Sequence, residues 1–483
     1  MRTVVIGGSI AGLVTGLALA RDGHDVTILE RDAQPLPASP RDAASQWRRG
    51  GVPQVRQAHG FVCRTRSELV AGAPDVWQAL LDAGAVEQNL FDSRPASLRD
   101  CEREPGDDAL VFLACRRTTF EWVLRRAAER ECDVRVGSRV DGLCVDEADP
   151  RRVVGLHTAD GRLDADAVID ASGRAGGLSR RLAAAGLPPL ETASEDCHIV
   201  YATRFYRLRP GASWGPLNRL WAAGGMFAGY GCMLFPQDDD TFSVVFSRLP
   251  HDAALADAYS PGGFSRAVAS VPFVSEWVDP QQAEPVGAPV PMAGIRNTLS
   301  RLPAVTGLFA VGDAVATTNP SFGRGAALAV ASGFALASAL SDRAGSLDEA
   351  AARYDEWYAT EVAPWYADAV SQDRTRFARW EEAAGLMSAE HVRAADVAAP
   401  APGAVGASRP PTVSPTLVAA AGITGDDPEV WRTFVRYAGL LAPPSTMLAT
   451  DISARVNAQL AAGWTPQMPA APSHADMVAA VQG

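Results

Sequence analysis

The stretch TVVIGGSIAG at residues 3–12 decides the first part of the fold. Residues 3–6 are all β-branched and predict a short strand, and the glycine-rich turn leads into residues 13–21, where small and apolar residues recur on one helical face. Gly23 ends this helix, and residues 25–30 (DVTILE) predict a second strand that finishes with an acid. Strand, glycine turn, helix, strand and acid in this order are typical of a dinucleotide-binding βαβ unit.

Each position of the turn has a physical task in such a unit. Gly7 allows the tight turn out of the strand, Gly12 lets the helix pack closely on the sheet, and the free N–H groups between them face a pyrophosphate. Glu30 can accept hydrogen bonds from ribose hydroxyls. Ser9 replaces the central glycine of the motif, and its hydroxyl adds a donor. The alternative is a glycine-rich packing turn in an α/β domain without a nucleotide.

A second glycine-rich segment indicates which dinucleotide is bound. Residues 307–314 (GLFAVGDA) predict a buried strand that ends in Gly312 and Asp313, followed by a loop at 319–325 and an alanine-rich helix at 326–340. This arrangement is suited to the ribityl chain of a flavin, with Asp313 on a ribityl hydroxyl. The positive end of the helix then lies near the flavin N1–C2=O edge, where it stabilises negative charge on the reduced ring. We therefore expect FAD.

The sequence resembles the FAD-dependent monooxygenases of the p-hydroxybenzoate hydroxylase fold. Within them it is most similar to the branch of the bacterial polyether epoxidases and, more distantly, squalene monooxygenase. The matching stretches occur in the order and spacing of the family, and they are residues 7–12 with 30–32, 49–54, 168–174, 312–325 and 443–445.

The resemblance implies roles for several polar residues. Arg48 or Arg49 would lie beside the flavin and its phosphates, Arg117 would reach FAD from the other side, and Asp170 lies in a segment that touches both FAD and NAD(P)H. The predicted cofactor-binding residues are Gly7, Gly8, Ser9, Ile10, Ala11, Gly12, Glu30, Arg31, Arg48, Arg49, Arg117, Asp170, Gly312, Asp313, Pro320, Gly323, Gly325 and Ala326.

Two positions depart from the pattern of the family. Residues 170–173 (DASG) replace the usual aspartate-glycine pair, which puts direct handling of NAD(P)H in question. Gln57 stands where the branch often has a histidine, although His59 follows it. His59 and His198 are candidate proton donors, with a structural role as the alternative for each.

The predicted fold is a Rossmann-type α/β FAD-binding domain with an inserted antiparallel β-sheet domain and a C-terminal helical region. The expected boundaries are 1–195 with 286–345 for the FAD-binding domain, 196–285 for the substrate-binding sheet and 346–483 for the helices. In the sheet we expect a strand at 198–206 and a hairpin of 226–235 with 241–246 around the turn DDD at 238–240. Residues 398–415, rich in Ala, Pro, Gly and Ser, predict a linker.

Aromatic and apolar side chains of the sheet are candidates for an apolar substrate cavity, although core packing is the commoner role for any one of them. Met226 and Tyr230 belong to this wider set. The predicted substrate-binding residues are Tyr201, Phe205, Phe227, Met233 and Phe235.

Composition narrows the classes of partner. The net charge is −12 with no basic tail, so nucleic acid is not expected as a partner. The seven cysteines show no CxxC spacing, which indicates free thiols in a reducing compartment and argues against a zinc site. The uncharged run at 4–20 is short for a membrane span and is better explained by the strand and helix above, so we expect a cytoplasmic protein without a membrane span.

The expected activity is monooxygenation, in which one oxygen atom of O2 enters an apolar small molecule through a flavin C4a-hydroperoxide. The product would be an epoxide or an alcohol, in natural-product tailoring. Electrons would come from NAD(P)H or from a separate flavin reductase, because no second glycine-rich βαβ unit is visible. The alternatives are a flavin-dependent reductase of carbon–carbon double bonds, like the geranylgeranyl reductases, and a non-catalytic FAD-binding subunit. A halogenase is disfavoured, because those enzymes use a lysine and this chain has neither lysine nor a Trp-x-Trp pair.

Overall fold

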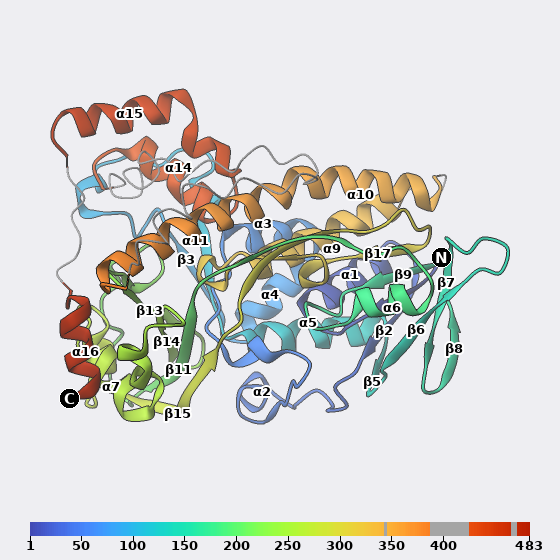
Figure 1. Ribbon diagram of the computed structural model, residues 1–483, viewed down its shortest axis with the longest axis horizontal. Coiled ribbons are helices and arrows are strands. Elements are labelled where there is room, and N and C mark those ends of the chain that lie inside the picture. The colour runs from blue at the N-terminus through green and yellow to red at the C-terminus, as the bar shows by residue number, and fades with distance from the viewer. Residues whose placement is uncertain (342–344, 387–424, 465–470) are drawn as a thin grey trace.

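The computed structural model describes residues 1–341, 345–386, 425–464 and 471–483, and the linker predicted at 398–415 lies outside these ranges. Two five-stranded sheets organise the chain (Figure 1). One is parallel, in the order β17–β9–β1–β2–β5, and the other is antiparallel, in the order β12–β13–β14–β11–β15. The fold is the predicted one, a Rossmann-like α/β domain into which an antiparallel sheet is inserted.

The parallel sheet is assembled from distant parts of the sequence. Its central strand β1 pairs with β2 on one side and with β9 on the other, and β17 adds to β9 after the chain has completed the antiparallel sheet. The carboxyl ends of β1, β9 and β17 therefore lie next to one another. The strands are β1 (Arg2–Ile6), β2 (Asp25–Glu30), β5 (Asp133–Val136), β9 (Ala167–Asp170) and β17 (Leu308–Ala310).

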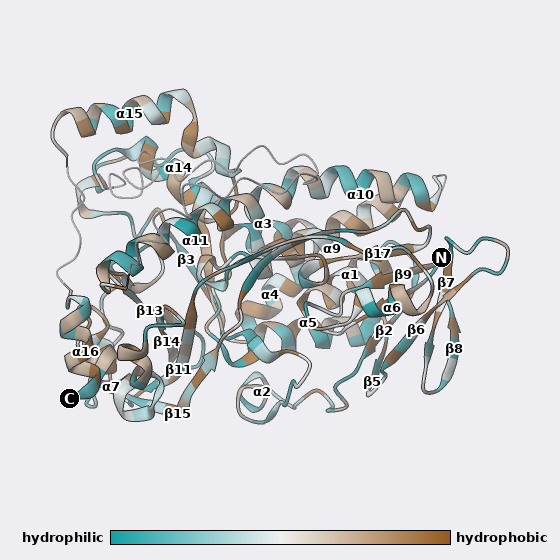
Figure 2. Cartoon of the chain, in the orientation of Figure 1, coloured by the Kyte–Doolittle hydropathy of each residue, from teal (hydrophilic) through white to brown (hydrophobic). Residues whose placement is uncertain are grey.

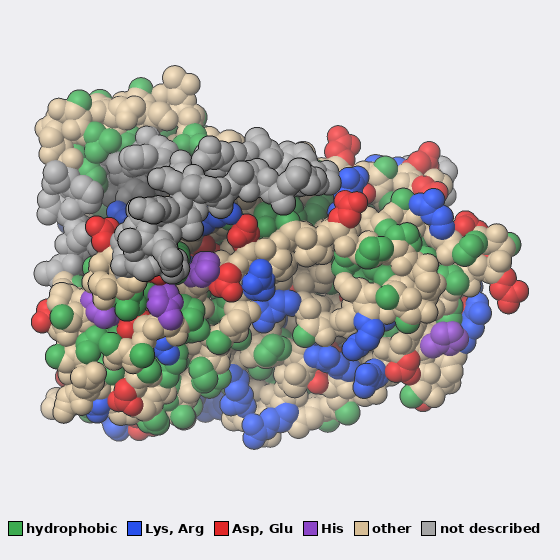
Figure 3. All heavy atoms as spheres, viewed as in Figure 1, with side chains coloured by type: hydrophobic (Ala, Val, Ile, Leu, Met, Phe, Trp, Pro, Cys, Tyr) green, Lys and Arg blue, Asp and Glu red, His purple; other side chains and the backbone are tan. Residues whose placement is uncertain are grey.

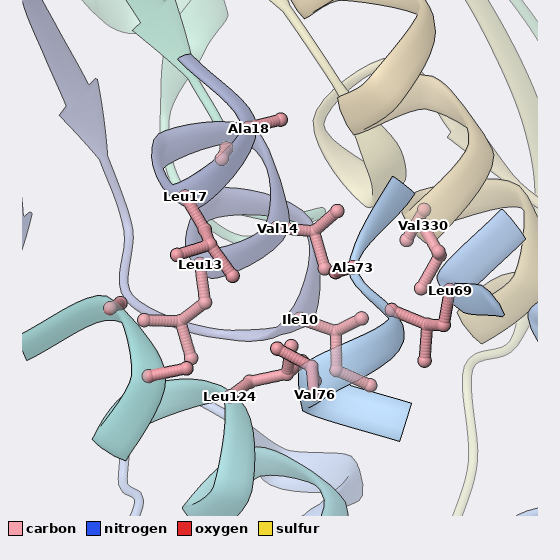
Figure 4. Packing of buried hydrophobic residues seen from close by; sticks show 14 of the residues in the cluster. Ile10, Leu13, Val14, Leu17, Ala18, Leu69, Ala73, Val76, Leu124 and Val330 are labelled. Atoms are coloured by element: carbon pink, nitrogen blue, oxygen red, sulfur yellow. The ribbon is translucent and has the colours of Figure 1, made fainter. Parts of the chain in front are cut away.

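Helix α1 (Ile10–Arg21) is buried along most of its length, which explains the uncharged run at 4–20. Figure 4 shows Leu13, Val14 and Leu17 of this helix among side chains of the neighbouring helices. A Cβ atom at Gly333 of α9 (Gly325–Leu340) would lie 2.9 Å from Thr15 Oγ1, so the two helices touch through this glycine. No helix among the described residues is long and apolar enough to cross a membrane.

The antiparallel sheet has two unlike faces. Alternate residues of one face, among them Tyr206, Leu234 and Phe246, form a core with α7 (Pro261–Ala269) and α16 (His474–Gln482). The predicted turn at 238–240 is present and joins β13 to β14, but the strand predicted at 226–235 is divided, because Met226 ends β12 and β13 begins at Tyr230. The strands are β11 (Val200–Leu208), β12 (Ala223–Met226), β13 (Tyr230–Pro236), β14 (Thr241–Arg248) and β15 (Ala283–Met292).

Two paired strands connect the sheets, since β10 leads into β11 and β16 follows β15.

Helices α10 (Leu347–Glu361) and α11 (Ala363–Ala383) run along one side of the molecule (Figure 1). Hydrophilic and hydrophobic residues alternate along α10, as expected for a helix with one buried side (Figure 2). The remaining elements are α2 (Pro40–Gln46), α3 (Cys63–Gly72), α4 (Pro74–Asp82), β3 (Val86–Asn89), β4 (Val111–Ala114), α5 (Arg117–Glu131), β6 (Val140–Val145), β7 (Val153–Thr158), β8 (Gly161–Asp164), α6 (Leu178–Ala184), β10 (Glu191–Asp196), α8 (Ser275–Val278), β16 (Arg296–Arg301), β18 (Ala316–Thr317), α14 (Pro428–Ala438) and α15 (Thr450–Ala461).

Candidate functional site

The two predicted glycine turns meet in the folded chain. Gly312 has a φ of +60°, and a Cβ atom there would lie 2.8 Å from the Cβ of Ala11. A Cβ atom at Gly7 would lie 2.5 Å from the carbonyl oxygen of Ala171, and one at Gly12 would lie 1.8 Å from the carbonyl oxygen of Gly7. The ends of β1, β9 and β17 therefore leave no room for side chains at these glycines, and the two turns border one site.

The start of α1 offers unused hydrogen-bond donors to that site. The backbone N–H groups of Ile10, Ala11 and Gly12 have no acceptor among the described residues, and Ser9 does not cap the helix with its side chain. Free N–H groups at the positive end of a helix bind anions such as a pyrophosphate. Ile10 can contribute only through its backbone, because its side chain lies in the hydrophobic core (Figure 4).

A buried ionic network surrounds the turn. The guanidinium group of Arg49 contacts Glu121 at 2.7 Å, Glu30 at 2.8 Å and Asp32 at 3.3 Å. It also donates to the carbonyl oxygen of Gly8 at 3.0 Å. Because these carboxylates already occupy it, Arg49 is a positioning residue for the turn. Its predicted place beside the flavin and its phosphates stays a prediction.

The other predicted residues at the end of β2 lie beside this network. Glu30 accepts a hydrogen bond from the Gly8 N–H at 3.1 Å, so the predicted ribose acid is placed next to the glycine turn. Arg31 donates to the carbonyl oxygen of Gly51 at 3.1 Å, and Arg48 is exposed. Their contacts with FAD stay predictions.

Arg117 contacts the glycine turn, and its predicted contact with FAD stays a prediction. It donates to Ser9 Oγ at 3.0 Å and pairs with Glu121 at 2.7 Å, four residues along α5, and Ser9 donates to the same carboxylate at 2.8 Å. Burial opposes the ionisation of Glu121, but Arg117 and Arg49 outweigh it and lower its pKa. The sequence interpretation did not include Glu121, although its spacing of four residues from Arg117 on one predicted helix is a usable signal.

Neither histidine has the geometry of a proton donor. His59 Nδ1 lies 3.0 Å from the carbonyl oxygen of Gln57 and so carries the proton, while Nε2 accepts from Arg117 at 2.8 Å. Burial and Arg117 lower the pKa of His59 to about 3, so the ring is neutral with both nitrogens engaged. His198 is partly exposed, and its ring stacks on Phe377 of α11 at 4.2 Å. These contacts favour the structural alternative for both, and the proton-donor role stays an untested prediction.

Asp313 has the character expected of a cofactor ligand. Its carboxylate makes no hydrogen bond or ion pair within the described ranges, and burial raises its pKa although Arg117 and Arg174 act against the rise. A partly buried carboxylate without a partner is unfavourable, and the hydroxyls of a ribityl chain would satisfy it. The N–H groups of Gly325 and Ala326 at the start of α9 likewise lack acceptors in the described chain. These residues fit FAD, which supplies redox chemistry when bound.

The loop before α9 is held from behind by the C-terminal helices. Asn319 donates to Asp373 of α11 at 2.6 Å, and Asn297 donates to the same carboxylate at 2.8 Å. Gly323 has a φ of +68°, and a Cβ atom there would lie 3.6 Å from Val62 Cγ1. The predicted positions Pro320, Gly323 and Gly325 thus lie on a loop that three distant segments fix in place.

Asp170 is engaged inside the protein. Its fully buried carboxylate pairs with Arg181 and accepts from Ser172 Oγ at 2.5 Å and from the Ser172 N–H at 3.0 Å. The side chain therefore shapes the turn after β9. The predicted contact of Asp170 and its segment with FAD or NAD(P)H stays a prediction.

Four of the five predicted substrate residues share one face of the antiparallel sheet. Tyr201 and Phe205 of β11 and Met233 and Phe235 of β13 occupy alternate positions, and the last three are partly exposed. The prediction for Phe227 is wrong. The chain reverses between β12 and β13, and the Phe227 ring packs into the core of the opposite face, 5.2 Å from the ring of Tyr230. Tyr230 lies in the same core, whereas Met226 is 36% exposed.

Two interactions link the antiparallel sheet to the segments of the candidate FAD site. Gln57 donates its Nε2 to the carbonyl oxygen of Val290 on β15 at 3.2 Å, two residues before His59. Arg174 interacts electrostatically with both Asp313 and Tyr201.

Figure 3 shows basic side chains gathered over the middle of one face of the molecule, although the chain is acidic overall.

Comparison with known proteins agrees with this geometry. Residues 2–94 match the family model described as FAD dependent oxidoreductase. Protein Rv3254 of Mycobacterium tuberculosis is 28% identical over 356 residues, which cover 67% of this chain and 69% of that protein. The predicted FAD-dependent oxidoreductase is confirmed at this level.

Solved structures share the fold at low sequence identity. The flavin-dependent brominase Bmp2 is 14% identical with a TM-score of 0.59, covering 95% of this chain and 98% of its own. PqsL of Pseudomonas aeruginosa, described as a probable FAD-dependent monooxygenase, is 18% identical with a TM-score of 0.53, covering 79% of this chain and 99% of its own. These similarities confirm the fold of flavin-dependent monooxygenases and halogenases.

Proposed function

We propose that the protein is an FAD-dependent monooxygenase that inserts one oxygen atom from O2 into an apolar organic substrate, by epoxidation or hydroxylation. One observation carries the proposal. The partly exposed apolar side chains Phe205, Met233 and Phe235 share one sheet face with Tyr201, and Arg174 acts electrostatically on both Tyr201 and Asp313. An apolar floor next to the flavin suits a reaction in which the protein excludes water and positions the substrate.

The residues of the chain have separate tasks in this proposal. The start of α1 binds the pyrophosphate of FAD, with Ser9 held by Arg117 and Glu121. Asp313 would accept hydrogen bonds from the ribityl hydroxyls of FAD, and the N–H groups at the start of α9 would stabilise negative charge on the reduced flavin. His59 remains neutral and keeps Arg117 beside the turn, so it holds its proton on Nδ1 against the Gln57 carbonyl oxygen.

The absence of lysine from the chain favours oxygen insertion over halogenation. The similarity to a brominase concerns the fold alone. Flavin-dependent halogenases use a lysine, and this chain has none. For the electron source we propose NAD(P)H or a separate flavin reductase. The natural-product role and the epoxidase branch also belong to this proposal.

The test is oxygen consumption coupled to product formation. The FAD-loaded protein is supplied with NADPH, or with a flavin reductase and NADH, and with a panel of apolar alkenes and arenes under isotopically labelled O2. We expect substrate-dependent O2 uptake and one labelled oxygen in the product. Asp313→Asn should lose this activity in proportion to its FAD content, whereas Glu129→Gln on exposed α5 surface should keep it.

The competing functions give different results in the same assay. Saturation of a double bond without O2 uptake would establish a reductase, and bound FAD without substrate-dependent electron transfer would establish a non-catalytic subunit. Either result overturns the proposal.

A further inference from the structure

A buried arginine lies at the start of α9, where a cation is unfavourable. Arg324 immediately precedes Gly325, the first residue of this helix, and is 3% exposed. The start of a helix carries positive charge, so a guanidinium group there is repelled unless an anion compensates it. Burial adds a further cost for a charge that lacks a partner. A specific set of contacts must therefore hold Arg324 in place.

The C-terminal helices supply these contacts. Arg324 Nη2 donates to the carboxylate of Asp368 on α11 and, at 3.1 Å, to the hydroxyl oxygen of Tyr437 on α14. The Tyr437 hydroxyl donates to the same carboxylate at 2.9 Å, and Gln372 Nε2 donates to it at 2.6 Å. Burial raises the pKa of Tyr437, so its hydroxyl keeps the proton that it donates. We call these four side chains, Arg324, Asp368, Gln372 and Tyr437, the α9 clamp.

Aromatic rings close around the guanidinium group of the clamp. Its Cζ lies 4.7 Å from the ring centroid of Phe322, 4.8 Å from that of Trp365 and 5.7 Å from that of Tyr437. Contacts of this kind attract a cation, most strongly where water is excluded. With one carboxylate and three rings around it, Arg324 anchors the start of α9 to α11 and α14.

The clamp lies one residue away from the candidate FAD site. A Cβ atom at Gly325 would lie 4.0 Å from Asp313 Oδ1, and the Gly325 N–H has no acceptor among the described residues. The backbone at this helix start thus borders the FAD site, while the side chain of Arg324 contacts the C-terminal helices. A ligand that binds this backbone acts on a segment that the clamp also holds.

Apolar packing strengthens the connection between α9 and α14. Leu328, in the first turn of α9, shares a buried cluster with Val430 and Tyr437 of α14. Because such interiors are closely packed, a displacement at the start of α9 disturbs the seat of α14. Order imposed on one of these helices should therefore stabilise the other.

We propose that Arg324 is a positioning residue that couples the binding of FAD to the docking of α14. FAD fixes the start of α9, and the α9 clamp passes this order to α14. By linkage, a docked α14 raises the affinity for FAD by the same factor. The coupling concerns the bound cofactor and is independent of the oxygen insertion proposed above.

Hydrogen exchange of backbone amides, measured with and without FAD, tests the coupling. We expect FAD to slow exchange in residues 428–438 of α14 about fivefold more than in α16. Helix α16 packs on the antiparallel sheet, outside the cluster of α9 and α14, and so reports any general stabilisation by FAD. Equal slowing in the two helices would overturn the proposal.

Two variants break the clamp in different places. Arg324→Met removes the cation, and Tyr437→Phe removes only the hydroxyl that joins α14 to Arg324 and Asp368. Each should reduce the extra protection of α14 about threefold or more and raise the Kd for FAD by a similar factor. If both variants kept the extra protection of the wild type, Arg324 would have no part in the coupling.

Arg432→Met is the matched control for loss of a buried arginine. Arg432 lies on α14 itself but pairs with Asp107, at 3.2 Å, away from α9. The variant should unfold more easily, yet FAD should still protect its α14 as in the wild type. The same loss of protection in this control would show that any damage to α14 suffices and would overturn the role of the clamp. The measurement needs neither O2 nor electrons, so its outcome is separate from that of the oxygen-insertion assay.

Discussion

Arg49 and Glu121 form an ion pair of 2.7 Å in which both side chains are almost entirely buried, at 1% and 0% exposure. The pair joins the loop after α2 to α5, and the same two residues contact Gly8 and Ser9 of the glycine turn. The turn that is expected to hold the FAD pyrophosphate is thus fixed by charges from two other segments.

Glu121→Gln should destabilise the protein and weaken FAD binding. The substitution leaves Arg49 and Arg117 buried without their shared carboxylate, so we expect a loss of about 3 kcal/mol in the free energy of unfolding. Chemical denaturation and titration of the FAD-free protein with FAD measure the two effects.

Glu129→Gln is the matched control, because it removes a carboxylate of the same helix that pairs with Arg125 at the same spacing but is 38% exposed. Its effect should stay below about 1 kcal/mol. Equal losses in the two variants would contradict the role given to Glu121.

Gly312→Ala should lower the FAD content of the purified protein and its Tm. The new Cβ would lie 2.8 Å from the Cβ of Ala11 and would separate the two glycine turns. Gly294→Ala is the control, since Gly294 has a similar φ of +64° and no atom within 4 Å of a Cβ there. Gly294→Ala introduces backbone strain without a steric contact. The same loss of FAD in both variants would therefore show that the contact of residue 312 with Ala11 is irrelevant.

Asp313→Asn should change stability and FAD affinity in opposite directions. Burial raises the pKa of Asp313, so in the FAD-free protein the ionised carboxylate destabilises the folded state. Wild-type stability should fall as the pH rises from below the unfolded value of about 3.9 through the folded pKa, and the variant should lack this fall. Urea unfolding of both proteins across this range measures the difference.

The same substitution should raise the Kd for FAD about tenfold or more, because the amide replaces a charged acceptor for the ribityl hydroxyls. Flavin fluorescence on titration measures the Kd. Unchanged FAD affinity in this variant, or in Asp313→Ala, would remove Asp313 from the site.

Asp373→Asn should weaken FAD binding from a distance. Asp373 lies on α11 and accepts hydrogen bonds from Asn297 and Asn319, and an amide there would present donors to donors. We expect a loosened loop before α9 and a Kd for FAD raised about threefold to tenfold. Arg374→Ala is the control, because Arg374 lies on the same helix as Asp373. It removes an exposed ion pair with Glu195 and should leave the Kd for FAD unchanged.

The dinucleotide-binding unit could be predicted from sequence because its signals are local. The predicted strand at 25–30 coincides with β2, and the helix after the glycine turn begins three residues earlier than predicted because Ile10 already has helical backbone geometry. Residue type selected Tyr201, Phe205, Met233 and Phe235, and the strand register then placed them on one face. Residue type also selected Phe227, which follows β12 in a turn and packs into the opposite core.

Long-range pairing decided what the local patterns left open. Arg48 and Arg49 are adjacent residues of the same type, so the sequence does not distinguish them. Arg49 is buried among carboxylates and Arg48 is exposed, because only Arg49 contacts Glu121, 72 residues away in the sequence. His59 and Gln57 likewise depend on distant partners. His59 accepts a hydrogen bond from Arg117, and Gln57 donates one to the backbone of β15.

The sequence by itself determined the βαβ unit, the Gly-Asp segment and the alternating strands, since hydrophobic period, glycine position and terminal acids act over a few residues. Only the tertiary structure decided that Gly312 lies against Ala11 and that Glu121 accepts a hydrogen bond from Ser9. These facts depend on packing between segments far apart in the chain, and no local pattern records which distant partner a buried charge or hydroxyl meets.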